Sequence, residues 1–284
     1  RYRLRKKDKK TSARLGTVIT PHGRIQTPAF MPVGTQATVK TQLPKEIEKA
    51  GAHIILSNAY HLYIRPGLDI INLHGGLHNF MGWQKPILTD SGGYQVFSLA
   101  KLRKVTHDGA TFHSHFDGRK ITFTPEKVIR IQETIGSDIA MVFDECLSYP
   151  SSKNDVRSSL ELTLDWARRS KNVHTKRKQA LFGIVQGGMY PDLRMESLER
   201  TVEIGFDGYA LGGLSVGEPS DILYNIVSRT APSMPADKPR YLMGVGHPRD
   251  ILEAVSSGID MFDCVIPTRY GRNGTAFTEK GMVV

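Results

Sequence analysis

The chain has 284 residues, of which 39% are hydrophobic, and its 38 Lys and Arg against 28 Asp and Glu give a formal charge of +10. Its apolar stretches all fall short of the roughly 18 residues that cross a bilayer, which excludes a membrane-spanning protein. The basic balance favours a polyanionic partner such as nucleic acid. The two cysteines, Cys146 and Cys264, are too few for a disulfide framework or a metal site of their own, and we expect a cytoplasmic protein.

The N-terminus is strongly basic, with seven Arg and Lys among its first ten residues. Such a run is typical of a solvated tail, and contact with RNA is the less favoured interpretation. After it come eight short β-rich runs separated by turn residues or helical patterns, as repeated β-α-β units require. They are residues 29–33, 54–58, 87–90, 139–144, 181–186, 209–212, 241–245 and 260–265. Eight such strands predict an α/β fold, a (β/α)8 or TIM barrel, as one catalytic domain over residues 1–284.

Three helices between these strands have clear signals. Thr124 can cap a helix that starts at Pro125 and ends at Gly136. After the fourth strand, apolar residues at i, i+4, i+8 and i+11 predict a long helix with one buried stripe: Val156, Leu160, Leu164 and Ala167. His247-Pro248 opens a further helix, in which we expect three residues to face inward: Ile251, Leu252 and Val255.

Two features depart from the regular repeat. The segment between Asp90 and Thr124 is longer than a simple connection and contains two turn signals, at residues 107–110 and 116–119. We therefore expect an antiparallel hairpin inserted after the third strand, on the rim of the barrel. After the eighth strand only a short segment follows, so we expect the closing helix of the barrel to be absent from this chain.

Four of the runs end in a polar side chain: Asp90, Asp144, Gln186 and Asp263. In a parallel barrel the carboxyl ends of the strands form the open face where active sites lie, and an unpaired carboxylate is too costly to bury in a core. We therefore expect these side chains to converge on a polar, flat ligand. Taken singly, each has a structural alternative, since Asp90 could cap a turn and Asp144 could form one salt bridge.

The combination matches the edge of guanine. Its N1–H and N2–H₂ groups can donate to one carboxylate, and its O6 and N7 atoms accept from N–H groups. Asp144, Gln186 and the Gly213 amide could supply these partners. Asp263 is then available to attack an anomeric carbon, with Asp90 as a second acid to manage protons.

A ribose that belongs to a nucleic acid adds two requirements. The target nucleotide must flip out of its stack to reach such a pocket. Its phosphates also need cationic partners, and two basic residues that follow the eighth strand, Arg269 and Arg272, are placed to supply charge-assisted hydrogen bonds.

The local motifs around these residues occur in a fixed order along nearly the whole chain. They are Asp90-Ser91-Gly92-Gly93-Tyr94-Gln95, Phe143-Asp144-Glu145-Cys146, Gln186-Gly187-Gly188, residues 211–218, residues 241–246, and Met261-Phe262-Asp263-Cys264 followed by Pro267-Thr268-Arg269. This series resembles the bacterial queuine tRNA-ribosyltransferase family, also called tRNA-guanine transglycosylases.

The resemblance implies a tRNA-modifying reaction. Guanine at anticodon wobble position 34 of tRNAs for Asp, Asn, His and Tyr, which share a GUN anticodon, is exchanged for the queuosine precursor preQ1 (7-aminomethyl-7-deazaguanine). The exchange is a double displacement through a covalent enzyme-tRNA intermediate, and it needs no catalytic cofactor. Val216 and Cys146 are similar to the bacterial form, which favours preQ1 over queuine. The family is commonly homodimeric.

The resemblance also implies individual roles. Asp263 takes the place of the nucleophile and Asp90 that of the general acid/base. The base-binding positions are Asp144, Gln186, Gly213, the Leu214 carbonyl, and the pair Tyr94 and Met243 on either face of the base, with Ser91 and Cys146 completing the substrate site. Arg269 and Arg272 are expected to bind RNA. The family's structural Zn²⁺ is held by three cysteines and a histidine that would lie beyond Val284, so we expect no metal site in this chain.

Two other classes of function remain as alternatives. A barrel glycosidase would also use two acids at strand ends, but its sugar cleft is typically lined by several Trp and this chain has only Trp83 and Trp166. A noncatalytic tRNA-binding subunit would have no use for a nucleophile. The presence of both Asp90 and Asp263 therefore favours the enzyme.

Overall fold

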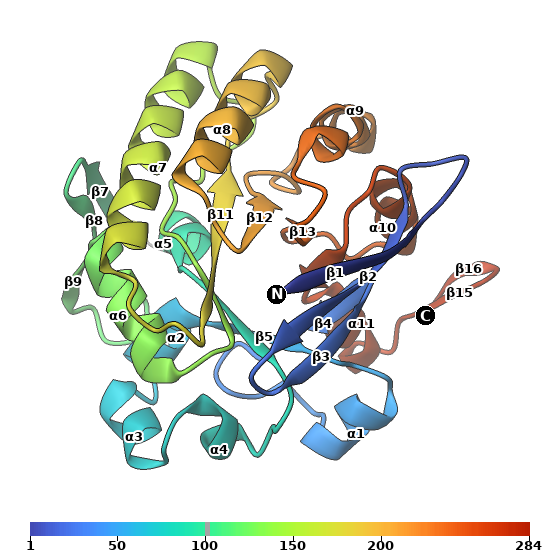
Figure 1. Cartoon of the computed structure of the whole chain (residues 1–284). Helices are drawn as coiled ribbons and strands as arrows, with labels where there is room; N and C mark the ends of the chain where they lie inside the picture. Colours follow the sequence, from blue (N-terminus) through green and yellow to red (C-terminus); the bar gives the residue numbers. More distant parts are fainter. Residues whose placement is uncertain (100–102) are drawn as a thin grey trace.

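The computed structural model describes residues 1–99 and 103–284. Its centre is a parallel sheet with the strand order β4-β14-β13-β12-β11-β10-β6-β5. The two ends of this order meet, because Val33 forms a parallel bridge with Leu56, and the Gly34 N–H donates to the Leu56 carbonyl at 2.6 Å. The sheet is therefore a nearly closed barrel (Figure 1). Its strands are β4 (Ala29–Pro32), β5 (Ile55–Asn58), β6 (Ile87–Asp90), β10 (Ile139–Met141), β11 (Ala180–Val185), β12 (Gly208–Leu211), β13 (Arg240–Leu242) and β14 (Met261–Cys264).

All eight predicted strands are confirmed, although several ladders are shorter than expected. Strands β5, β6 and β10 are buried along their whole length, as parallel strands covered on both faces must be. The run predicted as strand 139–144 leaves the ladder after Met141. Its last residues continue to the open end of the barrel, where side chains can reach a ligand.

Helices cover the outside of the barrel (Figure 1). The longer ones are α6 (Pro125–Ile135), α7 (Lys153–Val173), α8 (Pro191–Ile204), α9 (Ser220–Thr230) and α10 (Pro248–Ser256). Shorter helices lie between the first three barrel strands and after the third: α1 (Pro44–Lys49), α2 (Ala59–Ile64), α3 (Leu68–Leu73), α4 (Leu77–Met81) and α5 (Gly93–Leu99). A 3-10 turn, η1 (Ala231–Ser233), follows α9. No helix among the described residues is long and apolar enough to cross a membrane.

The helix signals are confirmed with one exception. The Thr124 hydroxyl accepts from the Lys127 N–H at 3.2 Å, and Gly136 ends α6 in the left-handed conformation with φ of 77°. All four residues of the α7 stripe are buried. The inward assignment of Leu252 is wrong, because this side chain is 70% exposed. The buried face of α10 is instead set by Ala254, with Ile251 and Val255 beside it.

The insertion after the third barrel strand is antiparallel, as predicted, but it has three strands where two were expected. They are β7 (Arg103–Thr106), β8 (Gly109–His113) and β9 (Lys120–Phe123). The inner face of this sheet carries Phe112 and Phe123, which pack on Tyr60 of α2. The insertion is therefore anchored to the barrel by aromatic contacts.

The solvated-tail interpretation of the N-terminus is wrong. The basic run forms β1 (Tyr2–Lys7), which pairs with β2 (Arg14–Thr20), and β2 pairs with β3 (Gly23–Thr27). An edge strand can carry many exposed Lys and Arg, since their charge keeps other strands from pairing with it. Tyr2 anchors the strand by donating to Asp260 at the amino end of β14. The sheet thus lies across the amino-terminal end of the barrel (Figure 1).

The segment after the eighth strand is more ordered than the sequence suggested. It contains the short helix α11 (Ile266–Arg272) and a hairpin of β15 (Ala276–Thr278) and β16 (Gly281–Val283). Helix α11 is only seven residues long and begins directly after Val265, so it lies at the carboxyl end of β14. This places Arg269 and Arg272 on the same end of the barrel as Asp263.

Candidate active site

The predicted polar residues gather at the carboxyl end of the barrel. Asp90 is the last residue of β6, Gln186 directly follows β11, and Asp263 is the next-to-last residue of β14. Asp144 follows β10 by three residues and Gly213 follows β12 by two. Since the strands are parallel and adjacent, these positions face one another across a single opening.

Asp144 and Gln186 form one hydrogen-bonded group. The Gln186 amide donates to Asp144 Oδ2 at 2.7 Å, and the Ser91 hydroxyl donates to Asp144 Oδ1 at 3.3 Å. Burial raises the pKa of Asp144 to about 6, and the two hydrogen bonds oppose that rise. At neutral pH the Asp144 side chain is therefore mostly a carboxylate, which can accept hydrogen bonds from a ligand but cannot donate them.

The hydrogen-bond partners of Asp90 are neutral amide groups and not cationic side chains. Its Oδ2 accepts from the Asn58 side chain at 2.5 Å and the Gln95 side chain at 2.9 Å, and its Oδ1 accepts from the Ala59 N–H at 3.2 Å. Burial raises its pKa to about 7, and the charge of nearby Asp263 contributes to the rise, while the hydrogen bond from Asn58 opposes it. A carboxyl group with this pKa can both give and take a proton at neutral pH.

Asp263 has one oxygen engaged. Its Oδ1 accepts from the Tyr241 hydroxyl at 2.5 Å and from the Gly244 N–H at 2.8 Å. Among the described residues, none donates a hydrogen bond to the other oxygen, Oδ2. Burial raises the pKa of Asp263, opposed by the same two donors. The arrangement fixes the carboxylate and leaves an oxygen to react.

The other predicted site residues lie around this group. Leu214 and Cys146 are buried, whereas Met243 is partly exposed and Tyr94, in α5, is 50% exposed. Burial raises the pKa of the Cys146 thiol to about 12, so it is neutral and a poor nucleophile. The RNA-binding candidates in α11, Arg269 and Arg272, are both exposed.

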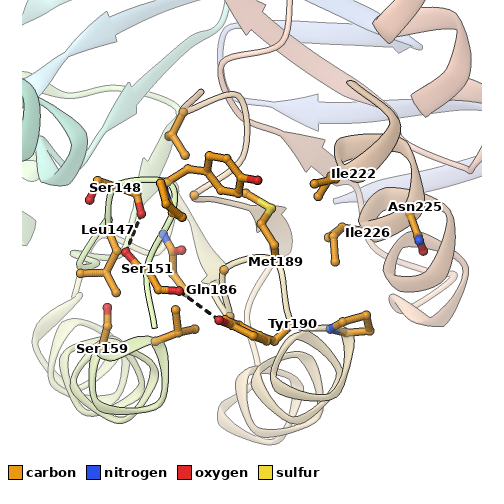
Figure 2. A pocket seen from close by; sticks show the side chains of 18 residues that line it. Leu147, Ser148, Ser151, Ser159, Gln186, Met189, Tyr190, Ile222, Asn225 and Ile226 are labelled. Carbon is orange, nitrogen blue, oxygen red and sulfur yellow. Dashed lines mark hydrogen bonds between the residues drawn. The ribbon is translucent and has the colours of Figure 1, made fainter. Parts of the chain in front are cut away.

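Gly213 approaches Gln186 too closely for any other residue type. Its φ is 63°, and a Cβ at this position would lie 2.3 Å from Gln186 Oε1. Behind these two residues is a cavity of about 470 Å³ (Figure 2). Its walls are the 147–151 loop, the turn at residues 187–190 and one face of α9, with Ile222 and Ile226 on the α9 side. Two of the base-reading candidates, Gln186 and Gly213, therefore lie on one wall of a larger cavity.

One group of metal-ligating side chains occurs among the described residues, and it lies at the other end of the barrel. It consists of His22, His78 and Asp138. The two imidazole rings stack with centroids 3.6 Å apart and an interplanar angle of 19°, and two of their nitrogens, His22 Nδ1 and His78 Nε2, are each hydrogen-bonded to an Asp138 oxygen at 3.0 Å. Asp138 also accepts from the backbone N–H groups of His22 and Ile87. We interpret the cluster as a hydrogen-bonded anchor for the β2–β3 turn.

Three residues of the site were not predicted. Asn58 ends β5 just as Asp90 ends β6, so the rule that found the acids also applies to it. Gln95 lies inside a motif that was already singled out. Tyr241, the partner of Asp263, is a fully buried strand residue, and nothing in its sequence context separates it from a core tyrosine.

Comparison with known proteins decides the family. A family model described as queuine tRNA-ribosyltransferase matches residues 8–284. Proteins of that name from Thermoanaerobacter pseudethanolicus, Caldanaerobacter subterraneus and Ruminiclostridium cellulolyticum are 61%, 60% and 59% identical, in alignments that cover 100% of this chain and 76% of each relative. The chain belongs to the queuine tRNA-ribosyltransferase family.

This assignment confirms the resemblance and fixes the broad activity. Members of the queuine tRNA-ribosyltransferase family are pentosyltransferases, so the protein is an enzyme, and tRNA is its macromolecular substrate. The family reaction is transglycosylation at guanine in tRNA and involves no catalytic cofactor.

Proposed function

We propose that this enzyme exchanges guanine at wobble position 34 of tRNAs with a GUN anticodon, those for Asp, Asn, His and Tyr, for preQ1. The proposal rests on one observation above all. Two carboxyl groups, Asp90 and Asp263, lie close enough for their charges to interact, and among the described residues both oxygens of Asp90 accept hydrogen bonds whereas Asp263 Oδ2 accepts none.

Base recognition is assigned to the neighbouring group. The Asp144 carboxylate accepts from N1–H and N2–H₂ of the purine, and the Gln186 amide and Gly213 N–H donate to its O6 edge. The Leu214 carbonyl accepts from the aminomethyl group of preQ1. Tyr94 and Met243 cover the two faces of the base, and Ser91 and Cys146 complete the walls.

The chemistry proceeds in two displacements. Asp263 Oδ2 attacks the ribose C1′, the C1′–N9 bond breaks, and guanine leaves with the bonding electron pair and a proton from Asp90. Asp90, now a carboxylate, takes the N9 proton of the incoming preQ1. N9 then attacks C1′ and displaces Asp263, which restores both groups. One N-glycosidic bond is exchanged for another, so no external energy source is needed.

The tRNA must present its wobble nucleotide flipped out of the anticodon stack. Arg269 and Arg272 lie on the barrel end where the phosphates would pass, and we assign them to RNA binding. From the family resemblance we further propose a cytoplasmic homodimer. The family's structural Zn²⁺ needs three cysteines, which this chain of two cysteines cannot supply, and no step above involves a metal.

Incorporation of radiolabelled guanine into unmodified tRNA tests the proposal. The wild-type protein should label tRNAs with a GUN anticodon, unlabelled preQ1 should compete, and Asp263→Ala should abolish labelling. Asp144→Ala should weaken selection of the base. Arg157→Ala is a suitable control, because Arg157 is exposed on α7 and its ion-pair partner in the part of the chain that the structure describes is Glu196.

The alternatives give different results in the same assay. A glycosidase would incorporate no label into tRNA. A noncatalytic subunit would bind tRNA equally well as wild type and Asp263→Ala and be inert in both forms. Either result would refute the proposed exchange.

A further inference from the structure

Arg194, in α8, is a fully buried cation whose hydrogen-bond partners are backbone carbonyls. Its Nε donates to the Gly188 carbonyl at 2.8 Å, and Nη1 donates to the carbonyls of Val185 and Gly212 at 2.9 and 2.7 Å. Nη2 donates to the Gly213 carbonyl at 3.3 Å. Burying a guanidinium is costly, and filling space alone would not require a charged side chain here, so its contacts point to a further role.

The four acceptors belong to the two loops that carry base-reading candidates. Val185 and Gly188 flank Gln186 at the end of β11, and Gly212 and Gly213 follow β12. The planar guanidinium thus joins two neighbouring strand ends through donors of fixed geometry. A lysine could not do the same, because its single nitrogen cannot reach acceptors spread over both loops.

This contact fixes the direction of the Gly212–Gly213 peptide. In a trans peptide the N–H points opposite to the C=O. Since the Gly212 carbonyl points at Arg194, the Gly213 N–H points away from it, and within the described part of the chain this N–H makes no hydrogen bond. An oriented and unused donor next to Gln186 is what an acceptor on a ligand requires.

We propose that Arg194 is a positioning residue for base binding: it holds the Gly212–Gly213 peptide and the Gln186 loop in the orientation that reads the purine edge. Arg194 does not touch the base; it acts through Gly213 and Gln186. This inference rests on the proposed function, because it assumes that these two groups face the base. Figure 2 shows Gln186 on the wall of the cavity, beside the turn at residues 187–190, whose Gly188 carbonyl accepts from Arg194.

Arg240 offers a matched control. It is also buried and also donates to backbone carbonyls, those of Met234 and Gly258, but it starts β13 at the opposite end of the barrel. Loss of either arginine removes buried hydrogen bonds and should lower Tm. Only loss of Arg194 should change how the base binds.

The test compares wild type, Arg194→Lys, Arg194→Met and Arg240→Lys. Guanine exchange is measured at saturating tRNA over a range of guanine concentrations, at a temperature well below each Tm. Arg194→Lys should raise KM for guanine on the order of tenfold, since a small misplacement of positioning groups is enough for such an effect, and Arg194→Met should raise it further. The value of kcat should change less than about twofold, because binding is lost equally in ground and transition states. Arg240→Lys should lower Tm and leave KM unchanged.

An unchanged KM in Arg194→Lys would overturn the inference, and so would an equal rise in KM for Arg240→Lys. If Arg194→Met does not fold, Arg194→Lys decides the question. If the wild type itself exchanges no guanine, the proposed function fails separately. Equilibrium dialysis of labelled guanine against the same four proteins then tests Arg194 directly, with weaker binding in Arg194→Lys expected and equal binding contradicting the inference.

Discussion

Carboxylates at the two ends of the barrel strands have different surroundings. Asp138 and Asp260 precede their strands and pair with groups that can carry positive charge, since Asp260 bonds to Arg14 at 2.5 Å and Asp138 contacts His22 and His78. Asp90, Asp144 and Asp263 lie at the other end, with amides, hydroxyls and backbone N–H groups as partners. The first kind stabilises the fold, whereas the second kind keeps a raised pKa, which for Asp90 suits the proton transfer that we propose.

The raised pKa of Asp90 predicts a trade-off between catalytic activity and folding stability. Its pKa of about 7 in the folded state lies above the 3.8 of an unperturbed aspartic acid, so the stability it contributes is fully present below about pH 4 and is lost as the pH rises to about 7. Asp90→Asn removes the charge. It should therefore raise the free energy of unfolding by about 2 kcal/mol or more at pH 8, and by almost nothing near pH 4, while abolishing exchange. Thermal denaturation across this pH range checks the prediction.

Asp138→Asn is the contrasting control. Burial raises the pKa of Asp138, but hydrogen bonds from His78, the Ile87 N–H and His22 outweigh it and the net pKa is lowered. Its carboxylate stabilises the fold at neutral pH, so the substitution should lower Tm at pH 8. A loss of stability at pH 8 in Asp90→Asn would contradict the account of Asp90.

Among the elements, α6 was predicted most closely, because its signals are local. A cap, a proline at the first position and a terminal glycine act within one turn of the helix and need no knowledge of the fold.

Thr124→Ala should lower the free energy of unfolding by about 1 kcal/mol, since the Lys127 N–H loses its acceptor. Thr134→Ala, at an exposed position of the same helix, should have little effect. Urea unfolding measures both, and equal effects would rule out the capping role.

At the scale of the whole molecule, the sequence predicts the barrel and the converging acids because both follow from a local pattern, an apolar run with a polar residue at its carboxyl end. It does not predict which distant residues meet. The basic N-terminal run reads as a tail, since its strand character comes from pairing with β2 and from Tyr2 reaching Asp260. The role of Arg194 could likewise not be predicted, because in the sequence it is one basic residue among the charged residues of a helix. Leu252 was misplaced because a hydrophobic side chain does not by itself identify the buried face.

The central claim is that Asp263 forms a covalent bond to the ribose of tRNA. The most direct measurement is to trap the protein with tRNA, digest the product with trypsin and ribonuclease, and identify the modified peptide by mass spectrometry. The account predicts a ribose-linked fragment on the peptide that contains Asp263, bonded to its carboxylate, and none in Asp263→Ala. An adduct on a different residue, or one that persists in Asp263→Ala, would contradict it.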